Sequence, residues 1–301
     1  MAKPVIKLDS VTKKFSKFTA VEDVTLSVNQ GEIVGFVGVN GAGKTTTINM
    51  LLGFTSPTRG TVALFDEQIK PWNAHLSHQR IGYAAGDMQL PAKMTGRQYL
   101  GFVVAQSDGD YHKRLAMLTK QFSPQLDKKM GTLSRGNKQK IALVAAFVAE
   151  PDLIILDEPT SGLDPIMQEA FLNLVRSEQK RGATIFMSSH YLQEVAEVCS
   201  RVLLMKNGRV VEDLSAETLQ STSGKSVKIV SEKKIAPLQH DASDIDQVKH
   251  ANKYQLTFVY KGSILDLQRW LGRQVGVIDF EITERTLEAE FRNLYTDEGR
   301  K

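Results

Sequence analysis

A glycine-rich loop between an apolar run and a helical segment constrains the fold of this chain more than any other feature. The apolar run, residues 33–37, reads IVGFV, and the loop after it reads GVNGAG. The next segment, KTTTINMLL, has apolar residues at helical spacing and stops before Gly53, a residue type that commonly ends helices. A strand, a loop and a helix in this order predict an α/β unit with the loop at the end of a buried strand.

The loop matches the phosphate-binding pattern G-x-x-x-x-G-K-[ST], with Gly38, Gly43, Lys44 and Thr45 at its fixed positions. Glycines let consecutive backbone amides face inward around phosphates, and the helix start adds positive potential. Lys44 would then reach the β and γ phosphates, and the Thr45 hydroxyl would bind Mg²⁺. A loop that only turned the chain would leave Lys44 unexplained. The residues predicted to bind the nucleotide here are Asn40, Gly41, Ala42, Gly43, Lys44, Thr45 and Thr46.

Two acids follow a second apolar run, residues 153–156, which reads LIIL. A phosphate loop needs a metal-orienting carboxylate on a neighbouring strand, and Asp157 is the expected Mg²⁺ partner. Glu158 points the other way on an extended chain and is placed to polarise a water for attack on the γ phosphate. Either acid alone is compatible with a turn at a strand end. The pair, in a chain with a phosphate loop, favours catalysis.

Further strand and helix candidates surround this unit. Residues 4–15 and 20–29 are predicted antiparallel strands, and residues 88–150 are mainly helical. Residues 183–190, ATIFMSSH, form another continuous apolar strand of the buried parallel type. The Asn-Gly pair at residues 207–208 predicts a hairpin.

A polar stretch, residues 220–226, is a predicted linker between two domains. It separates an expected nucleotide-binding domain, residues 1–220, from a small α+β domain, residues 225–301. The strands expected in the second domain lie near residues 226–230, 254–261 and 277–283, and its helices near residues 263–274 and 286–297.

Composition leaves the type of partner open. The net charge of +4 and pI near 8.9 fit a nucleotide, an anionic lipid or a nucleic acid without choosing among them. The single cysteine, Cys199, forms no intrachain disulfide and is expected to pack in the core. The N-terminus has no apolar signal core, and the longest apolar run, residues 141–149, is short of the roughly 20 residues that span a bilayer. Any membrane role therefore needs a partner protein.

The stretch LSRGN, residues 133–137, lies at the start of the predicted helix that contains the apolar segment IALVAAFVAE. Two interpretations of this stretch are possible. Ser134 is a good helix cap, and Gly136 tolerates a bend. The stretch also resembles the signature sequence LSGGQ of the ATP-binding cassette (ABC) ATPase family. That resemblance implies that the signature faces the γ phosphate of ATP held by a second subunit. Its residues are Leu133, Ser134, Arg135, Gly136 and Asn137, of which Arg135 and Asn137 depart from the family pattern.

Other motifs follow in the order of the same family. The stretch SGLD resembles its D-loop, which implies a crossing between subunits; its residues are Ser161, Gly162, Leu163 and Asp164. His190 resembles the switch histidine, which implies that it holds the γ phosphate and the attacking water. Phe15 lies where the family stacks adenine, with Val21 as an apolar flank and Phe18 as a rival; packing roles for both phenylalanines stay open.

The clearest departure lies at residues 81–90, IGYAAGDMQL, where the family has a glutamine at the position of Gly86. Glycine offers no side chain to a metal or a water. Asp87 or Gln89 would have to substitute, or turnover would be slower. If the missing side chain matters, replacing Gly86 by glutamine is expected to raise turnover or Mg²⁺ affinity.

The resemblance covers roughly residues 5–212 and implies a fold and a function. The fold expected is α/β, a P-loop ABC ATPase core with an antiparallel β subdomain and a helical signature subdomain at about residues 88–150, plus the small C-terminal domain. The cofactors implied are ATP and Mg²⁺. The partners implied are separately encoded transmembrane permease subunits and a second ABC subunit, with no nucleic acid, at the cytoplasmic face of the cell membrane. The stretches SPTRGTVALFD and DFEITERTLEAEFRNLY resemble bacterial cassette subunits that pair with exporter-type membrane proteins, in the drug, lipid or antibiotic self-resistance class. The function implied is therefore that of an ATP-binding and ATP-hydrolysing subunit, which powers a membrane exporter through ATP-driven dimerisation of two cassettes.

Two other functions remain as alternatives. A soluble ABC ATPase acting on ribosomes or DNA usually carries two cassettes or a long coiled-coil insertion. Only about 90 residues separate Lys44 from Ser134, too few for such an insertion beside a helical lobe. A phosphate-loop kinase would leave the signature and the D-loop unexplained.

Overall fold

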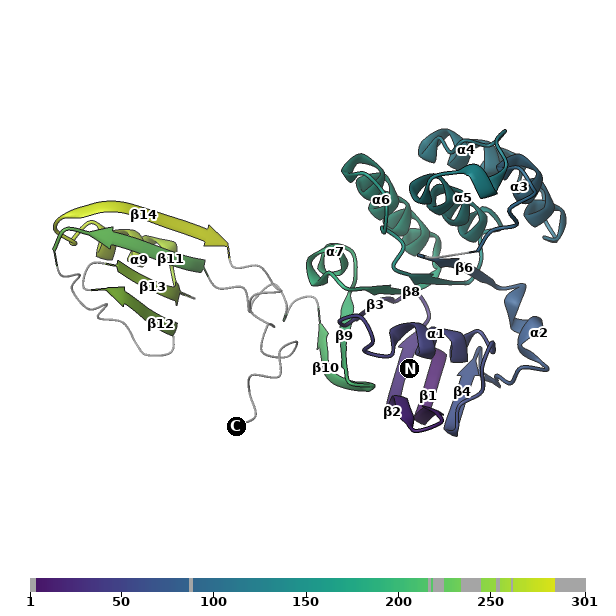
Figure 1. Ribbon diagram of the computed structural model, residues 1–301, viewed down its shortest axis with the longest axis horizontal. Helices are drawn as coiled ribbons and strands as arrows, with labels where there is room; N and C mark the ends of the chain where they lie inside the picture. The colour runs from purple at the N-terminus through teal and green to yellow at the C-terminus, as the bar shows by residue number, and fades with distance from the viewer. Residues whose placement is uncertain are drawn as a thin grey trace. The chain divides into compact units, whose positions relative to one another are not determined.

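The computed structural model describes residues 4–86, 89–215, 218, 225–233, 245–252, 255–260 and 262–284. The chain forms two compact units, residues 1–216 and residues 217–301. Figure 1 shows the elements of both.

A six-stranded sheet in the order β10-β9-β3-β8-β7-β6 forms the centre of the first unit. Its strands are β3 (Ile33–Val37), β6 (Ile81–Ala85), β7 (Leu153–Asp157), β8 (Thr184–Ser189), β9 (Arg201–Lys206) and β10 (Arg209–Ser215). All pairs are parallel except β9 with β10. Every residue of β3, β7 and β8 is buried, because helices cover both faces of a parallel sheet and its strands are therefore apolar throughout. The sheet thus carries the ends of β3, β7 and β8 to one edge.

A four-stranded sheet in the order β2-β1-β4-β5 packs beside it. Its strands are β1 (Pro4–Phe15), β2 (Phe18–Asn29), β4 (Arg59–Leu64) and β5 (Glu67–Gln68). All its pairs are antiparallel. One apolar face of this sheet joins helix α1 (Lys44–Leu51) and the central sheet in a single core, so the antiparallel sheet supports the helix that follows the glycine loop.

A group of helices forms the other end of the first unit (Figure 1). They are α3 (Gly96–Ala105), α4 (His112–Phe122), the 3₁₀ turn η1 (Met130–Thr132), α5 (Arg135–Val148) and α6 (Pro165–Arg181), and two short helices, α2 (Ala74–His78) and α7 (Leu192–Ala196), lie elsewhere in the unit. Polar side chains fix where these helices start. The Ser134 hydroxyl caps α5 and the Asp164 carboxylate caps α6 by accepting hydrogen bonds from backbone amides. The predicted helical segment at residues 88–150 is confirmed by α3, α4 and α5.

A buried charge cluster ties α4 to α6. The Glu178 carboxylate is 2% exposed and pairs with the guanidinium groups of Arg114 and Arg181. Arg114 also lies 3.3 Å from Glu150, and its Nε donates to the carbonyl of Phe147 at the end of α5. Each buried charge therefore has a partner, as burial requires.

The Asn-Gly hairpin is confirmed, with Asn207 at φ 49° and Gly208 at φ 80°, the left-handed pair that a type I′ turn needs. Cys199 lies beyond the end of α7. Its thiol is buried, and burial raises its pKa above the usual range of cysteine. This fits the expected packing role.

The second unit contains an antiparallel sheet in the order β12-β13-β11-β14. Its elements are β11 (Lys225–Ser231), β12 (Ile245–Asn252), β13 (Gln255–Tyr260), α9 (Ile264–Leu271) and β14 (Val277–Glu284). Leu267 and Trp270 of α9 pack on Val227, Ile229 and Phe258 of the sheet, which gives this unit its own core. Lys225, predicted as linker, belongs to β11 together with Ser226, where the predicted linker and strand overlap, because strand pairing with β13 and β14 extends to both residues. The helix expected at residues 286–297 lies outside the described residues.

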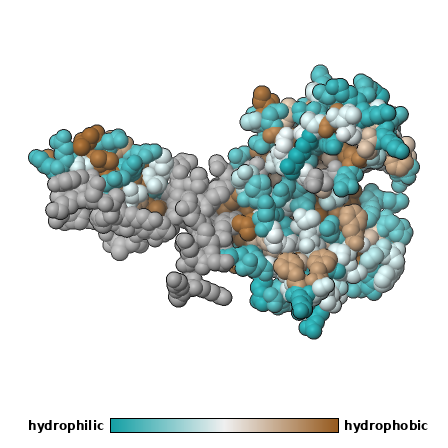
Figure 2. Space-filling model, viewed as in Figure 1, coloured by the Kyte–Doolittle hydropathy of each residue, from teal (hydrophilic) through white to brown (hydrophobic). Residues whose placement is uncertain are grey.

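The face drawn in Figure 2 is mostly hydrophilic, with hydrophobic side chains in separate patches. Within the described ranges, no helix combines the length and the apolar character needed to cross a bilayer.

Candidate functional site

The glycine loop connects the end of β3 to the first residue of α1. Gly41 and Gly43 have φ values of 82° and 110°, which L side chains rarely adopt. Lys44, 5% exposed, folds its ammonium back into the loop, where Nζ donates to the carbonyl of Gly38 at 2.7 Å. Asn40 and Gly41 are exposed. The loop is therefore a cradle with a lysine charge at its base, the arrangement that binds phosphates.

The hairpin turn between β9 and β10 packs against this loop and is hydrogen-bonded to it. The amide of Gly208 donates to the carbonyl of Ala42 at 2.9 Å, and the amide of Glu22 donates to the carbonyl of Gly208 at 2.8 Å. A Cβ atom at Gly38 would collide with the carbonyl of Met205. The Asn-Gly pair predicts this turn but not its role, because the contacts join segments that lie far apart in the sequence and leave no local signal.

Thr45 and Asp157 meet in front of the loop. The Thr45 hydroxyl donates to Oδ2 of Asp157 at 2.7 Å, and the Ser188 hydroxyl donates to Oδ1. Asp157 is 5% exposed, so these two hydroxyls fix a buried carboxylate. Ser188 is not among the predicted site residues, although its position in MSSH at the end of a predicted strand could have indicated that it lies near the acids.

The Glu158 carboxylate lies between the side chains of Lys44 and His190, both of which are predicted site residues. Its Oε1 is 3.6 Å from Nζ of Lys44, and its Oε2 is 3.7 Å from Nδ1 of His190. Its backbone has φ 50°, and its amide donates to the Ser188 hydroxyl at 3.1 Å. The ring of Tyr191 lies 3.9 Å from that of His190, centroid to centroid. The strained turn aims the Glu158 carboxylate at the loop and not along the strand.

The signature residues lie at the start of α5. The Ser134 hydroxyl accepts from the backbone and side-chain amides of Asn137, so the capping prediction is confirmed. Leu133 is buried and anchors the segment. Gly136 packs so closely on the D-loop that an added Cβ would lie 2.5 Å from the carbonyl of Gly162.

The D-loop fills the turn between β7 and α6. The amide of Ser161 donates to the carbonyl of Glu158 at 3.2 Å, and that of Leu163 to the carbonyl of Thr160 at 3.0 Å. Leu163 is buried, and Asp164 accepts from the amide of Met167 at 3.0 Å as the cap of α6. The D-loop is therefore a hydrogen-bonded turn continuous with Glu158.

Gly86 follows β6 and lies against the turn that carries the two acids. A Cβ atom at this position would be 2.9 Å from the carbonyl oxygen of Glu158 and 3.1 Å from that of Asp157. Close backbone approach is therefore a physical reason for glycine here. Asp87, one proposed substitute for the missing glutamine, lies outside the described residues, and Gln89 is exposed.

Phe15 and Phe18 face each other across the tip of the β1–β2 hairpin and are 49% and 63% exposed. The Lys13 ammonium lies 5.0 Å from the Phe15 ring centroid. Val21 has no exposed surface, and Cγ2 of Val21 is near the backbone of Gly43. Val21 is therefore part of the core beside the phosphate loop, whereas both phenylalanines are exposed at the tip of the hairpin.

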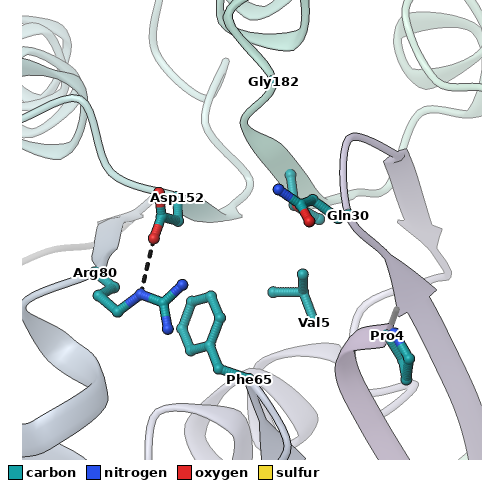
Figure 3. A pocket seen from close by; sticks show the side chains of 8 residues that line it. Pro4, Val5, Gln30, Phe65, Arg80, Asp152 and Gly182 are labelled. Atoms are coloured by element: carbon teal, nitrogen blue, oxygen red, sulfur yellow. Dashed lines mark hydrogen bonds and ion pairs between the residues drawn. The ribbon is translucent and has the colours of Figure 1, made fainter. Parts of the chain in front are cut away.

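A separate cavity of about 210 Å³ opens at the opposite edge of the central sheet, where β7 and β8 begin. Arg80 donates to Asp152 at 2.8 Å and lies 3.8 Å from the Phe65 ring centroid (Figure 3). The proposed phosphate, metal and acid residues lie at the ends of the strands, so this cavity is not the nucleotide site.

The loop, the buried lysine and the paired acids at one sheet edge define a P-loop nucleoside-triphosphatase. The family model for ABC transporters matches residues 21–161. An ABC transporter ATP-binding protein of Bacillus subtilis (strain 168), YhaQ, is 32% identical over 94% of this chain and 96% of its own length. The Nod factor export ATP-binding protein I of Burkholderia lata is 35% identical over 70% of this chain and 71% of its own length.

A solved structure of an ATP-binding subunit of an ABC transporter has a TM-score of 0.66 at 29% identity, covering 72% of this chain and 92% of that one. The chain belongs to the family of ATP-binding proteins of ABC transporters, and it is an ATPase. The expected fold class is confirmed.

Proposed function

We propose that this chain binds ATP with Mg²⁺ and hydrolyses it to drive export through separate membrane subunits. One observation carries the proposal: Lys44, Asp157 and Glu158 converge at the carboxyl edge of a parallel sheet, beside a loop built for phosphates. In open α/β sheets, ligands bind at this edge.

The residues present fit a magnesium ion. Mg²⁺ prefers hydroxyl and carboxylate oxygens and is usually held by one or two protein ligands together with substrate phosphates. Thr45 and Asp157 supply such a pair, with 2.7 Å between their oxygens. When bound, the ion would neutralise charge on the phosphates.

The remaining roles follow from position. Residues 40–46 would hold the phosphates through their amides and the Lys44 ammonium. Glu158 would accept a proton from the attacking water, and His190 would hold the γ phosphate beside it. The exposed Phe15 ring would stack on adenine, and Val21 would support the loop.

Cassettes of this family work as dimers with transmembrane components. We infer that this chain follows that scheme, with the signature residues 133–137 completing the ATP site of a second subunit. The start of α5 then directs its positive end at the γ phosphate. ATP would favour the closed pair because it binds that state better than the open one.

A groove of about 530 Å³ lies between α2 and β6 on one side and α3 and α5 on the other. This groove supports the proposal that a membrane subunit binds the chain. Leu76 and Phe102, next to the lining residues in sequence, are 58% and 57% exposed. We propose that this groove receives a cytoplasmic segment of the membrane subunit and that the chain works at the cytoplasmic face of the membrane. The name of the Nod factor export relative supports export over import.

The experiment makes two measurements. The first is Mg²⁺-dependent phosphate release by the purified chain, and the second is the fraction of the chain that is recovered together with membranes. We expect hydrolysis that Lys44→Ala removes, and recovery with a membrane subunit that Leu76→Asp and Phe102→Asp weaken. An active chain that does not associate with membranes and binds ribosomes or DNA instead would support the alternative of a soluble ABC ATPase.

A further inference from the structure

The first turns of α5 contact the catalytic turn of the same chain at three points. Arg135 and Gln139, four residues apart, lie on one face of the helix. The Gln139 side chain, 3% exposed, donates to the carbonyl of Pro159 at 2.9 Å. Between them, Gly136 packs on the carbonyl of Gly162. The signature segment is therefore attached to the turn that begins with Glu158.

Arg135 contacts both the turn and the segment after β6 that packs on it. Its Nη2 donates to the carbonyl of Gly86 at 3.4 Å. Its side-chain carbons lie about 3.5 Å from where a Cβ at Gly162 would be. Gly86 in turn packs on the carbonyls of Asp157 and Glu158. The guanidinium thus holds the segment after β6 against the backbone that presents the Glu158 carboxylate.

Two of the three residues that depart from the family pattern, Arg135 and Gly86, therefore contact each other. Glycine at position 86 allows close approach to the Asp157–Glu158 backbone but contributes no side-chain contact of its own. The long side chain of Arg135 supplies a donor to the carbonyl at that position. At 3.4 Å this hydrogen bond is long, and the packing of the Arg135 stem near Gly162 acts together with it.

We propose that Arg135 is a positioning residue for Glu158 of its own chain, acting through Gly86 and Gly162. This rests on the proposed function, in which residues 133–137 also complete the ATP site of the partner. The same segment then contacts the γ phosphate of one site and the catalytic turn of the other. Arg135 thereby couples occupancy of one site to the geometry of Glu158 in the second, and such coupling is reciprocal.

The test compares Arg135→Met, which keeps the stem but removes the donor, with Arg135→Lys, which restores a charged donor. Arg97→Met is the matched control, because Arg97 is an exposed arginine whose guanidinium pairs with Asp127 at the surface. Hydrogen exchange is measured first on the full chain without nucleotide, where no partner phosphate is present. ATP hydrolysis is then measured as kcat and KM.

We expect Arg135→Met to speed amide exchange in residues 158–164 and to lower kcat about tenfold, with KM changed less than about threefold. Arg135→Lys should restore most of both, and Arg97→Met should change neither. Unchanged exchange in Arg135→Met, or faster exchange with normal kcat, overturns the inference. A wild-type chain that hydrolyses no ATP overturns the proposed function instead, and the exchange comparison still decides whether Arg135 holds the turn.

Discussion

The Lys44 ammonium lies 3.6 Å from the Glu158 carboxylate, with the lysine buried and the glutamate side chain 29% exposed. The loop that would bind phosphates and the acid that would activate water therefore face each other without an intervening residue. Because the acid partly neutralises the lysine, arriving phosphates would compete with Glu158 for Lys44. The position of the carboxylate is then linked to whether the loop is occupied.

Replacing Glu158 by glutamine is expected to leave ATP binding intact and to stop hydrolysis. The amide keeps the shape of the side chain but cannot accept a proton, and positioned acid-base groups contribute about 10² to 10⁴ in rate. ATP-bound dimers should accumulate on gel filtration with Mg²⁺-ATP. Glu169→Gln, an exposed acid on α6, is the control. Near-normal phosphate release by Glu158→Gln would mean that another group orients the water.

Replacing Gly86 by glutamine is now expected to slow hydrolysis, opposite to the expectation from sequence. The new Cβ would lie 2.9 Å from the carbonyl oxygen of Glu158, so the backbone must shift before the side chain can reach any metal. Gly86→Ala, with a Cβ and no functional group, should show a similar loss in steady-state turnover. Faster turnover in Gly86→Gln alone would restore the original hypothesis.

Removing the Glu178 carboxylate should destabilise the first unit. Glu178→Ala leaves Arg114 and Arg181 without their buried partner, and breaking a buried pair typically costs about 3–5 kcal/mol. Urea unfolding followed by circular dichroism measures the free energy. Glu150→Ala is the matched control, because Glu150 also pairs with Arg114 but is 43% exposed, and the loss of its carboxylate should cost about 1 kcal/mol or less. Equal costs for both variants would show that burial of Glu178 is unimportant.

The fold is predictable from sequence where local patterns are strong. The continuous apolar runs of β3, β7 and β8 and the glycine loop each carry a local signal, and all lie as expected. Strand β6 is not predicted, because Gly82 interrupts a short run and is fixed by close packing on the carbonyl of Ala146, a contact between distant segments. Strand β12 reads IDQVKHAN and is recognisable only from its pairing with β13.

In the candidate site, too, residues in local motifs are predictable from sequence, whereas contacts between distant segments are not. Lys44, Thr45 and Asp157 stand in recognisable motifs, whereas the support from Gly208 and the contact between Arg135 and Gly86 depend on how distant segments pack. The sequence shows that positions 86 and 135 are unusual. Only the fold shows that they touch.

Truncation after Ser221 should leave nucleotide binding intact. The predicted phosphate-contacting residues lie in the first unit, and each unit has its own buried core. Titration with a fluorescent ATP analogue should give a Kd within about threefold of the full chain. A truncated chain that is folded by circular dichroism yet binds no nucleotide would show that the two units depend on each other.

The last prediction asks whether the signature serves the ATP of its own chain or that of a second subunit. Gly136→Asp would disturb the contact with Gly162, so Ser134→Asp is the better lesion. Aspartate keeps the helix cap of α5 and places a carboxylate against the γ phosphate. Ser134→Asn keeps the cap without the charge and is the matched control. Lys44→Ala supplies the second lesion, and each lesion alone should abolish hydrolysis.

Mixing the Lys44→Ala and Ser134→Asp chains should restore activity if the ATP sites are shared between subunits. In a mixed dimer both lesions fall in one composite site, and the other site keeps an intact lysine and an intact signature. With free exchange of subunits half of the dimers are mixed, so roughly a quarter of wild-type hydrolysis should return, or ATP-driven association if hydrolysis needs both sites. If each signature served its own chain, every site would keep one lesion. Folded chains that exchange subunits and show neither readout would therefore exclude the shared site.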